Sequence, residues 1–323
     1  MNTVFVDTSV LVAAEDTGQG ALHAAVLQWL DLLWRTRSGR TGSQSLCEFY
    51  EQVTTAAQPL PQGDARAAIR RYQTWTPAGP WMREYVNAVR AVWDCWQNGT
   101  PLDVRGPHYN INLMVPLFNP GPIEHPDIPI HLAAVNPVMC QIAGEVAEGI
   151  RPHPVCTPSY IAEVMLPAVR AGATKAGRPL DRFQVCMKPL VATAANEAEL
   201  VPKVRDARAR IAFYASTPQY RAAFDHLGLG DLADRLKLLS RAQRWEEMPQ
   251  HINDDVLHTF VTIATYDTIG RKLCDRYGGV VTNCEFSIAV KNDFDRELLR
   301  QLASDIQSEG VARAQRTVLG TAA

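Results

Sequence analysis

Residues 131–149 read HLAAVNPVMCQIAGEVAEG, and this stretch decides the fold. An apolar run ends at Val135, Asn136 is a favoured residue for the N-cap of a helix, and Pro137 suits the first helical position. The residues after Pro137 continue as a helix up to Glu148. The stretch therefore predicts a strand that leads directly into a capped helix, which is one unit of an α/β fold.

Further strands and helices alternate around this unit. The sequence predicts strands at residues 128–135, 149–153, 183–193 and 280–290, and helices at residues 137–148, 158–175, 197–215 and 265–277. Strands that alternate with helices favour a parallel sheet built from βα units. With the short strand at 149–153, four such units follow one another along the chain.

The end of the strand at 128–135 is a candidate anion site. A capped helix directs several free backbone N–H groups to one point, and its dipole favours negative charge there. Ala133 and Ala134 are small enough to let a ligand approach the backbone. The pattern indicates a phosphate site, although a βα unit also needs such a cap when it binds no ligand.

A histidine follows the next predicted strand. His153 lies between two prolines in RPHPVCT, where it is either a ligand-binding residue or a surface residue that forms hydrogen bonds. The spacing of the chain suggests no Ser/His/Asp or Cys/His arrangement. The sequence therefore identifies no catalytic residue.

The first part of the chain has a different pattern. Residues 3–12, TVFVDTSVLV, form a β-rich run with a single acid, Asp7, in its middle. Helix-like segments follow at residues 21–36, 44–55 and 64–72. An acid in an apolar strand is costly to bury unless a partner pairs with it, so Asp7 requires an explanation.

One explanation for Asp7 is a divalent metal ion. A carboxylate at the end of a strand commonly binds such an ion, and Glu48 lies on a predicted helix from which it could supply a second ligand. The alternative is that Asp7 caps a turn through Thr8 and Ser9 while Glu48 is solvated.

The junction WTPAGPWMREYV, residues 75–86, separates the two patterns. After it, residues 82–97 are amphipathic and lead into Asn98 and Gly99, which favour the end of a helix. We place a domain boundary here, with residues 1–76 as one part and residues 77–323 as the other.

Composition and charge exclude several classes of protein. The 323 residues are 46% hydrophobic and 20% charged, which is typical of a soluble globular chain. A formal net charge of −2 offers no broad positive field for nucleic acid. The first residues lack the positive region of a signal peptide, and no apolar run reaches the roughly 20 residues that span a bilayer. Seven scattered cysteines without a CxxC pair suggest reduced thiols, so we expect a cytoplasmic protein with no membrane contact.

Three stretches resemble the luciferase-like monooxygenase family. They are GPWMREYVNAVRAVWDCWQNGTPLDVRGPHYNINLM (79–114), FNPGPIEHPDIPIHLAAVNPVMCQIAGEVAEGIRPHPVCTPSYI (118–161) and GGVVTNCEFS (278–287). The resemblance runs from about residue 78 to residue 290 and is strongest to the branch that uses the deazaflavin coenzyme F-420.

This resemblance implies a (β/α)8 TIM-type barrel, an α/β fold with the coenzyme at the carboxyl ends of the strands. It implies that Ala133, Ala134, Val135 and Asn136 line the coenzyme, with His153 and Thr157 on the next loop. It also implies hydride transfer between the deazaflavin, or alternatively the flavin FMN, and a small organic substrate. The first barrel strands of the family have no counterpart in the sequence, so we expect a partial barrel, with loss of activity as one consequence.

The stretches VFVDTSVLVAAED (4–16) and SQSLCEFYEQVTT (43–55) resemble the front half of a PIN domain of the toxin ribonuclease type. This resemblance covers residues 1–75 and implies that Asp7 and Glu48 hold Mg²⁺ or Mn²⁺. The family takes one or two further acids from its second half, which has no match here. We therefore expect a vestigial metal site and little ribonuclease activity.

Three hypotheses for the function follow from these resemblances. The first is a luciferase-like oxidoreductase, and the second is a PIN-type metal-dependent ribonuclease that acts on RNA, with Asp94 as a candidate third acid. The third is an inactive fusion of the two parts. Because a partial barrel leaves strand edges open, we also expect self-association into a homo-oligomer. The sequence does not identify the substrate.

Overall fold

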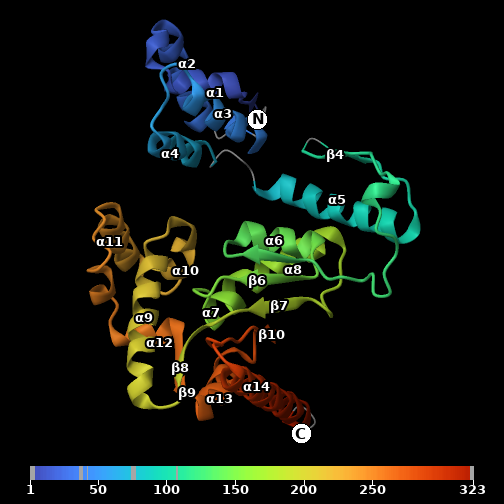
Figure 1. Cartoon of the computed structure of the whole chain (residues 1–323), viewed down its shortest axis with the longest axis vertical. Coiled ribbons are helices and arrows are strands. Elements are labelled where there is room, and N and C mark those ends of the chain that lie inside the picture. Colours follow the sequence, from blue (N-terminus) through green and yellow to red (C-terminus); the bar gives the residue numbers. More distant parts are fainter. Residues whose placement is uncertain (1–3, 36–38, 42, 74–77, 107, 321–323) are drawn as a thin grey trace. The chain divides into compact units, whose positions relative to one another are not determined.

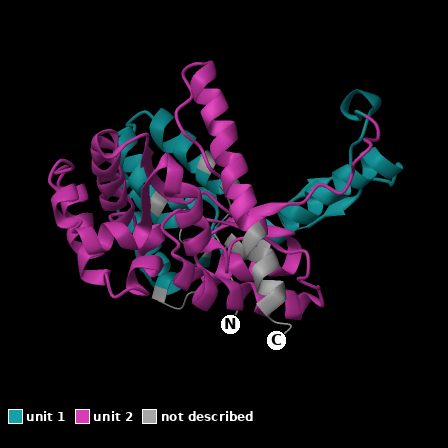
Figure 2. Ribbon diagram, turned by 90° about the horizontal axis from the view of Figure 1, so that it is seen from below, with its two compact units in different colours: residues 1–120 teal, residues 121–323 magenta. Residues whose placement is uncertain are grey.

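The computed structural model describes residues 4–35, 39–41, 43–73, 78–106 and 108–320. It divides the chain into two compact units, residues 1–120 (unit 1) and residues 121–323 (unit 2), which Figure 2 shows in different colours. The junction residues 76 and 77, at which the sequence analysis places a domain boundary, lie outside the described residues. That boundary stays a prediction.

Unit 1 begins with a pair of short parallel strands and continues with helices (Figure 1). β1 (Val4–Phe5) pairs with β2 (Gly39–Arg40). The helices are α1 (Thr8–Glu15), α2 (Ala21–Arg35), α3 (Ser43–Thr55), α4 (Gln62–Gln73) and α5 (Ala78–Asn98). Two 3-10 turns, η1 (Thr17–Gln19) and η2 (Pro116–Phe118), and a hairpin of β3 (Val104–Arg105) and β4 (Asn110–Ile111) complete the unit.

Helices α1 to α4 enclose an apolar core. Its buried members come from the apolar positions of each helix and include Leu11, Leu30, Leu33, Phe49 and Tyr72. Phe49 and Tyr72 meet edge to face with their ring centroids 5.7 Å apart. The three- and four-residue spacing of apolar residues on α2 is the sequence signal for this packing.

The predicted β-rich run at residues 3–12 is wrong for most of its length, because β1 ends at Phe5 and α1 begins at Thr8. Asp7 has the extended backbone of an N-cap (φ −77°, ψ 162°), and its carboxylate accepts a hydrogen bond from the Ser9 N–H. An N-cap of this kind stabilises a helix by about 0.5–2 kcal/mol and so favours a helix that begins at Thr8. Asp7 is therefore exposed at a helix start rather than buried in a strand.

Unit 2 contains a parallel sheet of four strands in the order β10-β7-β6-β5. The strands are β5 (His131–Ala134), β6 (Gly149–Pro152), β7 (Gln184–Met187) and β10 (Asn283–Cys284). A second parallel pair is formed by β8 (Leu190–Ala194) and β9 (Val261–Thr265). The parallel α/β architecture that the sequence predicts is therefore confirmed.

Two predicted strands differ from the observed ones. The run at 183–193 is divided into β7 and β8, which pair with different neighbours. Pro189 lies at the break, where its missing N–H cannot take part in a ladder. The run at 280–290 contributes only β10, although the Thr282 and Glu285 N–H groups extend the ladder to carbonyl oxygens of Val185 (3.0 Å) and Met187 (2.8 Å).

Helices connect these strands. α6 (Pro137–Val146) follows β5, and β6 leads into α7 (Pro158–Tyr160), the π-helical turn η3 (Ile161–Met165) and α8 (Leu166–Ala176). Between β8 and β9 lie α9 (Glu197–Ala215), η4 (Pro218–Tyr220), α10 (Arg221–Asp225), α11 (Gly230–Arg241), η5 (Met248–His251) and α12 (Asp254–Phe260). α13 (Tyr266–Tyr277) precedes β10, and α14 (Asp293–Gly320) follows it. No helix within the described ranges is long and apolar enough to cross a membrane.

Helices α6 and α8 pack at very short range (Figure 1). A Cβ atom on Gly144 would lie 2.1 Å from the Val169 carbonyl oxygen, and one on Gly172 would lie 1.9 Å from the Gln141 carbonyl oxygen. Only glycine fits at these two positions, because the obstacle in each case is backbone. This contact fixes α6, and with it the turn between β5 and α6.

Candidate functional site

Parallel pairing brings two loops of unit 2 together. In the register of β5 and β6, Ala133 lies opposite Arg151 and Ala134 lies opposite Pro152. The carboxyl ends of the two strands therefore share one edge of the sheet, and the loops that follow them are neighbours. This edge brings together the six residues that the sequence analysis assigns to a coenzyme, which are Ala133, Ala134, Val135, Asn136, His153 and Thr157.

The turn after β5 leaves polar groups available. Asn136 is the N-cap of α6 with φ −91° and ψ 153°, and its side chain makes no capping hydrogen bond. Its carbonyl oxygen accepts from the N–H groups of Met139 (3.1 Å) and Cys140 (3.2 Å). Pro137 begins the helix and has no N–H to satisfy. The Asn136 side-chain amide, the Asn136 N–H and the Val138 N–H are therefore the donors that this turn presents to an anion.

His153 is enclosed by aromatic rings from a distant part of the sequence. Its ring stacks on that of Tyr220 with centroids 3.9 Å apart, and it meets the Tyr214 ring edge-on at 4.7 Å. The Val155 N–H donates to Nδ1 (3.4 Å), which assigns the proton of the neutral ring to Nε2. Burial lowers the pKa of His153 to about 4, so the ring is uncharged at neutral pH. His153 is thus a half-buried, neutral hydrogen-bond donor rather than a surface histidine.

Thr157 and Tyr160 connect this loop with the turn after β5. Thr157 is buried and caps α7, where its hydroxyl oxygen accepts from the Tyr160 N–H (3.4 Å). The Tyr160 hydroxyl donates to the Val135 carbonyl oxygen at 3.0 Å. The sequence analysis missed Tyr160, and the sequence carries no signal for a bond between residues 25 positions apart.

The sequence analysis also missed a charged cluster on one face of the sheet. Ala133 and Arg151 are exposed on this face, whereas the preceding pair in the register is buried. Arg151 forms an ion pair with Glu285, and the Lys188 Nζ lies 3.1 Å from the same carboxylate. Hydrogen bonds from Lys188 and Arg151 lower the pKa of Glu285. The sequence signal for this cluster was the presence of Lys188 and Glu285 inside predicted strands that are otherwise largely apolar.

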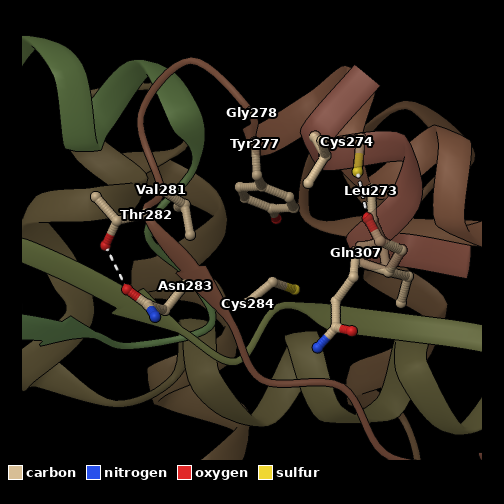
Figure 3. Close-up of a pocket in the computed structure, with 12 residues that line it drawn as sticks. Leu273, Cys274, Tyr277, Gly278, Val281, Thr282, Asn283, Cys284 and Gln307 are labelled. Atoms are coloured by element: carbon tan, nitrogen blue, oxygen red, sulfur yellow. Dashed lines mark hydrogen bonds between the residues drawn. The ribbon is translucent and has the colours of Figure 1, made fainter. Parts of the chain in front are cut away.

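A cavity of about 610 Å³ lies between α13, β10 and α14 (Figure 3). Both residues of β10, Asn283 and Cys284, line it together with Tyr277. Cys284 is exposed at this cavity and carries a free thiol. None of the six residues assigned to a coenzyme lines this cavity.

In unit 1, the pairing of β1 with β2 brings the starts of α1 and α3 to one edge. The Asp7 carboxylate accepts from the Ser9 hydroxyl (2.9 Å) and the Ser9 N–H (3.3 Å), which lower the pKa of Asp7. Glu48 accepts from the Thr8 hydroxyl at 2.8 Å. Asp7 therefore makes the capping turn that the sequence left open as an alternative. Within the described part of the chain, no group of three His, Cys, Asp or Glu side chains is arranged to hold a metal ion.

Comparisons with known proteins identify relatives of this chain. An uncharacterized protein of Mycobacterium tuberculosis (strain ATCC 25618 / H37Rv) is 40% identical over 200 residues, which cover 62% of this chain and 59% of the relative. The F-420-dependent glucose-6-phosphate dehydrogenase of Nakamurella multipartita is 26% identical over 189 residues, which cover 58% of this chain and 51% of that enzyme. The chain thus spans between about half and three fifths of the length of these curated relatives.

A solved structure shares the fold. The coenzyme F-420-dependent tetrahydromethanopterin reductase from Methanopyrus kandleri matches with a TM-score of 0.50 and 15% identity, over 88% of this chain and 75% of that one. The model of the family described as Luciferase-like monooxygenase matches residues 21–283. This match begins inside the stretch that resembles a PIN domain, and the PIN resemblance stays a prediction. Because the family model covers most of its residues, the chain belongs to the luciferase-like monooxygenase family.

Proposed function

We propose that this chain binds the deazaflavin coenzyme F-420 at the carboxyl ends of β5 and β6, as an oxidoreductase that acts on a small organic substrate. The observation that carries the proposal is the shared edge at which the turn after β5 meets the loop after β6. The relatives from Nakamurella and Methanopyrus support F-420 as the coenzyme, because both are F-420-dependent by name.

The residues at this edge suit a coenzyme with a phosphate group. Ala133 is exposed and small, so it leaves room beside the backbone. The Asn136 side-chain amide and the backbone N–H groups of Asn136 and Val138 present donors to an anion, and the dipole of α6 favours negative charge there. His153 offers a neutral Nε2–H, and Thr157 holds its loop in shape. A bound deazaflavin, or FMN as the alternative, supplies the capacity to exchange a hydride, and these residues supply position and electrostatics.

Equilibrium titration of F-420 into the purified full chain, followed by coenzyme fluorescence, tests the proposal. We expect saturable binding, and a parallel titration with FMN tests the alternative coenzyme. The family resemblance implies a partial TIM-type barrel, so we expect weaker binding than a complete barrel achieves and low or absent turnover. Failure of both coenzymes to bind would contradict the proposal.

We also propose that the chain works in the cytoplasm as a homo-oligomer. Six described cysteines have free thiols, which suits a reducing compartment. The edge strands β5 and β10 have no further strand beside them among the described residues. Open edges of this kind favour pairing with another chain.

The comparisons do not support the ribonuclease hypothesis for residues 1–76, because the matching family model begins at residue 21, inside the stretch that resembles a PIN domain. The hydrogen bond from Thr8 to Glu48 holds Glu48 beside the start of α1, where Asp7 lies. Asp94, the candidate third acid, instead accepts a hydrogen bond from Asn98 at 2.6 Å on α5. RNA cleavage that requires Mn²⁺ and is lost in Asp7→Asn would favour a nuclease, whereas no cleavage favours a vestigial metal site and an inactive fused segment.

A further inference from the structure

One hydrogen bond joins the two loops of the proposed coenzyme site. The Tyr160 hydroxyl donates to the Val135 carbonyl oxygen over 3.0 Å. Val135 directly precedes Asn136, the N-cap of α6, and Tyr160 ends α7, the helix that follows the loop after β6. The bond therefore holds the end of one loop against the end of the other.

The Tyr160 side chain is fixed from several directions. It is only 1% exposed, and its backbone N–H donates to the Thr157 hydroxyl oxygen. The His226 ring, at the end of α10, packs edge-on against the Tyr160 ring with centroids 5.5 Å apart. The π-helical turn η3 begins at the next residue. Such turns are rare in proteins overall, and those that occur are often found at functional sites. Burial raises the pKa of Tyr160 to about 12, so its hydroxyl remains a donor at neutral pH.

The bond to Tyr160 orients a whole peptide group. The Val135 carbonyl and the Asn136 N–H belong to one planar unit, and the structure has no cis peptide bond among the described residues. In a trans peptide the C=O and N–H point in opposite directions. When Tyr160 holds the carbonyl, the Asn136 N–H faces away from Tyr160. No acceptor in the described part of the chain bonds to this N–H.

We propose that Tyr160 is a positioning residue, which fixes the Val135–Asn136 peptide so that the Asn136 N–H faces the phosphate group of a bound F-420. This inference rests on the proposed function. Tyr160 acts only through this peptide and does not touch the coenzyme itself. Its hydroxyl therefore matters for the phosphate end of the ligand and not for the deazaflavin ring.

Titrations with two ligands test the inference. F-420 and a deazaflavin that lacks the phosphate group are titrated into wild type, Tyr160→Phe, Asn136→Pro and the double variant. Loss of one hydrogen bond corresponds to a roughly two- to tenfold weaker Kd, which we expect for F-420 in Tyr160→Phe. The phosphate-free deazaflavin should bind wild type and Tyr160→Phe equally. Tyr266→Phe, which removes a hydroxyl at the start of α13, is the matched control and should bind both ligands as wild type does.

The double variant tests whether Tyr160 acts through the Asn136 N–H or only stabilises the surrounding loops. Proline removes the Asn136 N–H itself, and the φ of −91° at this residue is near the value that proline adopts. If Tyr160 acts through this N–H, adding Tyr160→Phe to Asn136→Pro has no further effect on F-420 binding. Additive losses, or equal losses for both ligands, would overturn the inference.

The remaining outcomes distinguish the inference from the proposed function. Wild type that binds no F-420 overturns both. Wild type that binds F-420 while Tyr160→Phe binds it equally overturns the positioning role alone. If Tyr160→Phe does not fold, Asn136→Pro decides, because F-420 binding equal to that of wild type would show that this N–H does not contact the phosphate.

Discussion

Replacement of Gly172 by alanine should push α6 away from α8 and destabilise unit 2. A Cβ atom at Gly172 would lie 1.9 Å from the Gln141 carbonyl oxygen and 2.7 Å from its carbonyl carbon. Ordinary van der Waals contact begins at 3.4 Å, so the helices would have to separate by about 1.5 Å. Rotation of a side chain cannot relieve this clash, because the obstacle is backbone.

The expected cost follows from this geometry. Overpacking of a well-packed core costs about 1–3 kcal/mol. Gly144 is equally tight on the other side of the contact, 2.1 Å from the Val169 carbonyl oxygen, so α6 has little room to adjust. We therefore expect the upper part of that range, which in a unit of about 200 residues lowers the melting temperature by roughly 4–12 °C.

Thermal unfolding followed by circular dichroism measures this effect. Gly310→Ala is the matched control, because Gly310 also lies in a helix of unit 2 and a Cβ atom there meets nothing within 4 Å. This control should unfold at the wild-type temperature or slightly above it, since alanine reduces the entropy of the unfolded chain. Equal melting temperatures for Gly172→Ala and Gly310→Ala would refute the packing argument.

Two further predictions concern His153 and the sheet edges. The pKa of His153 falls from 6.5 to about 4 on folding, so the unfolded state binds the proton more readily between these values, and stability decreases as pH falls through this window. Urea unfolding between pH 4.5 and 7 measures the free energy of unfolding at each pH. This free energy should depend less steeply on pH in His153→Gln than in wild type, and an equal slope in the two proteins would count against the burial of the neutral ring. Light scattering at micromolar concentration should give a mass above the 35.7 kDa of one chain, and a monomer at every concentration would contradict pairing through β5 or β10.

Local signals in the sequence predicted the elements of unit 2 that need no distant partner. Asn136 and Pro137 placed the start of α6 correctly, and the predicted helix at 197–215 coincides with α9. The prediction of a strand over residues 3–12 was wrong because it relied on the strand preference of the valines. In the structure Asp7 caps a helix that begins at Thr8. Helix α11 was missed, although its buried Leu236 and Leu239 have a helical spacing.

The contacts that shape the candidate site were beyond sequence reasoning. Resemblance to a family indicated the loops, and the register of β5 and β6 brings them together. The bond from Tyr160 to Val135 and the stacking of His153 on Tyr220 join residues that are distant in the chain. One sequence contains no signal for such pairs, because each depends on how the strands and the helices between β8 and β9 pack.

The location of the coenzyme site is the central claim, and an amide NMR map of the isotope-labelled full chain tests it most directly. Addition of F-420 should shift the signals of Ala133, Val135 and Asn136 and those of the loop from His153 to Thr157, and the shifts should saturate. The signals of Cys274 and Gln307, which line the cavity between α13 and α14, should stay unchanged. Saturable shifts confined to that cavity, or no shifts at all, would contradict the account.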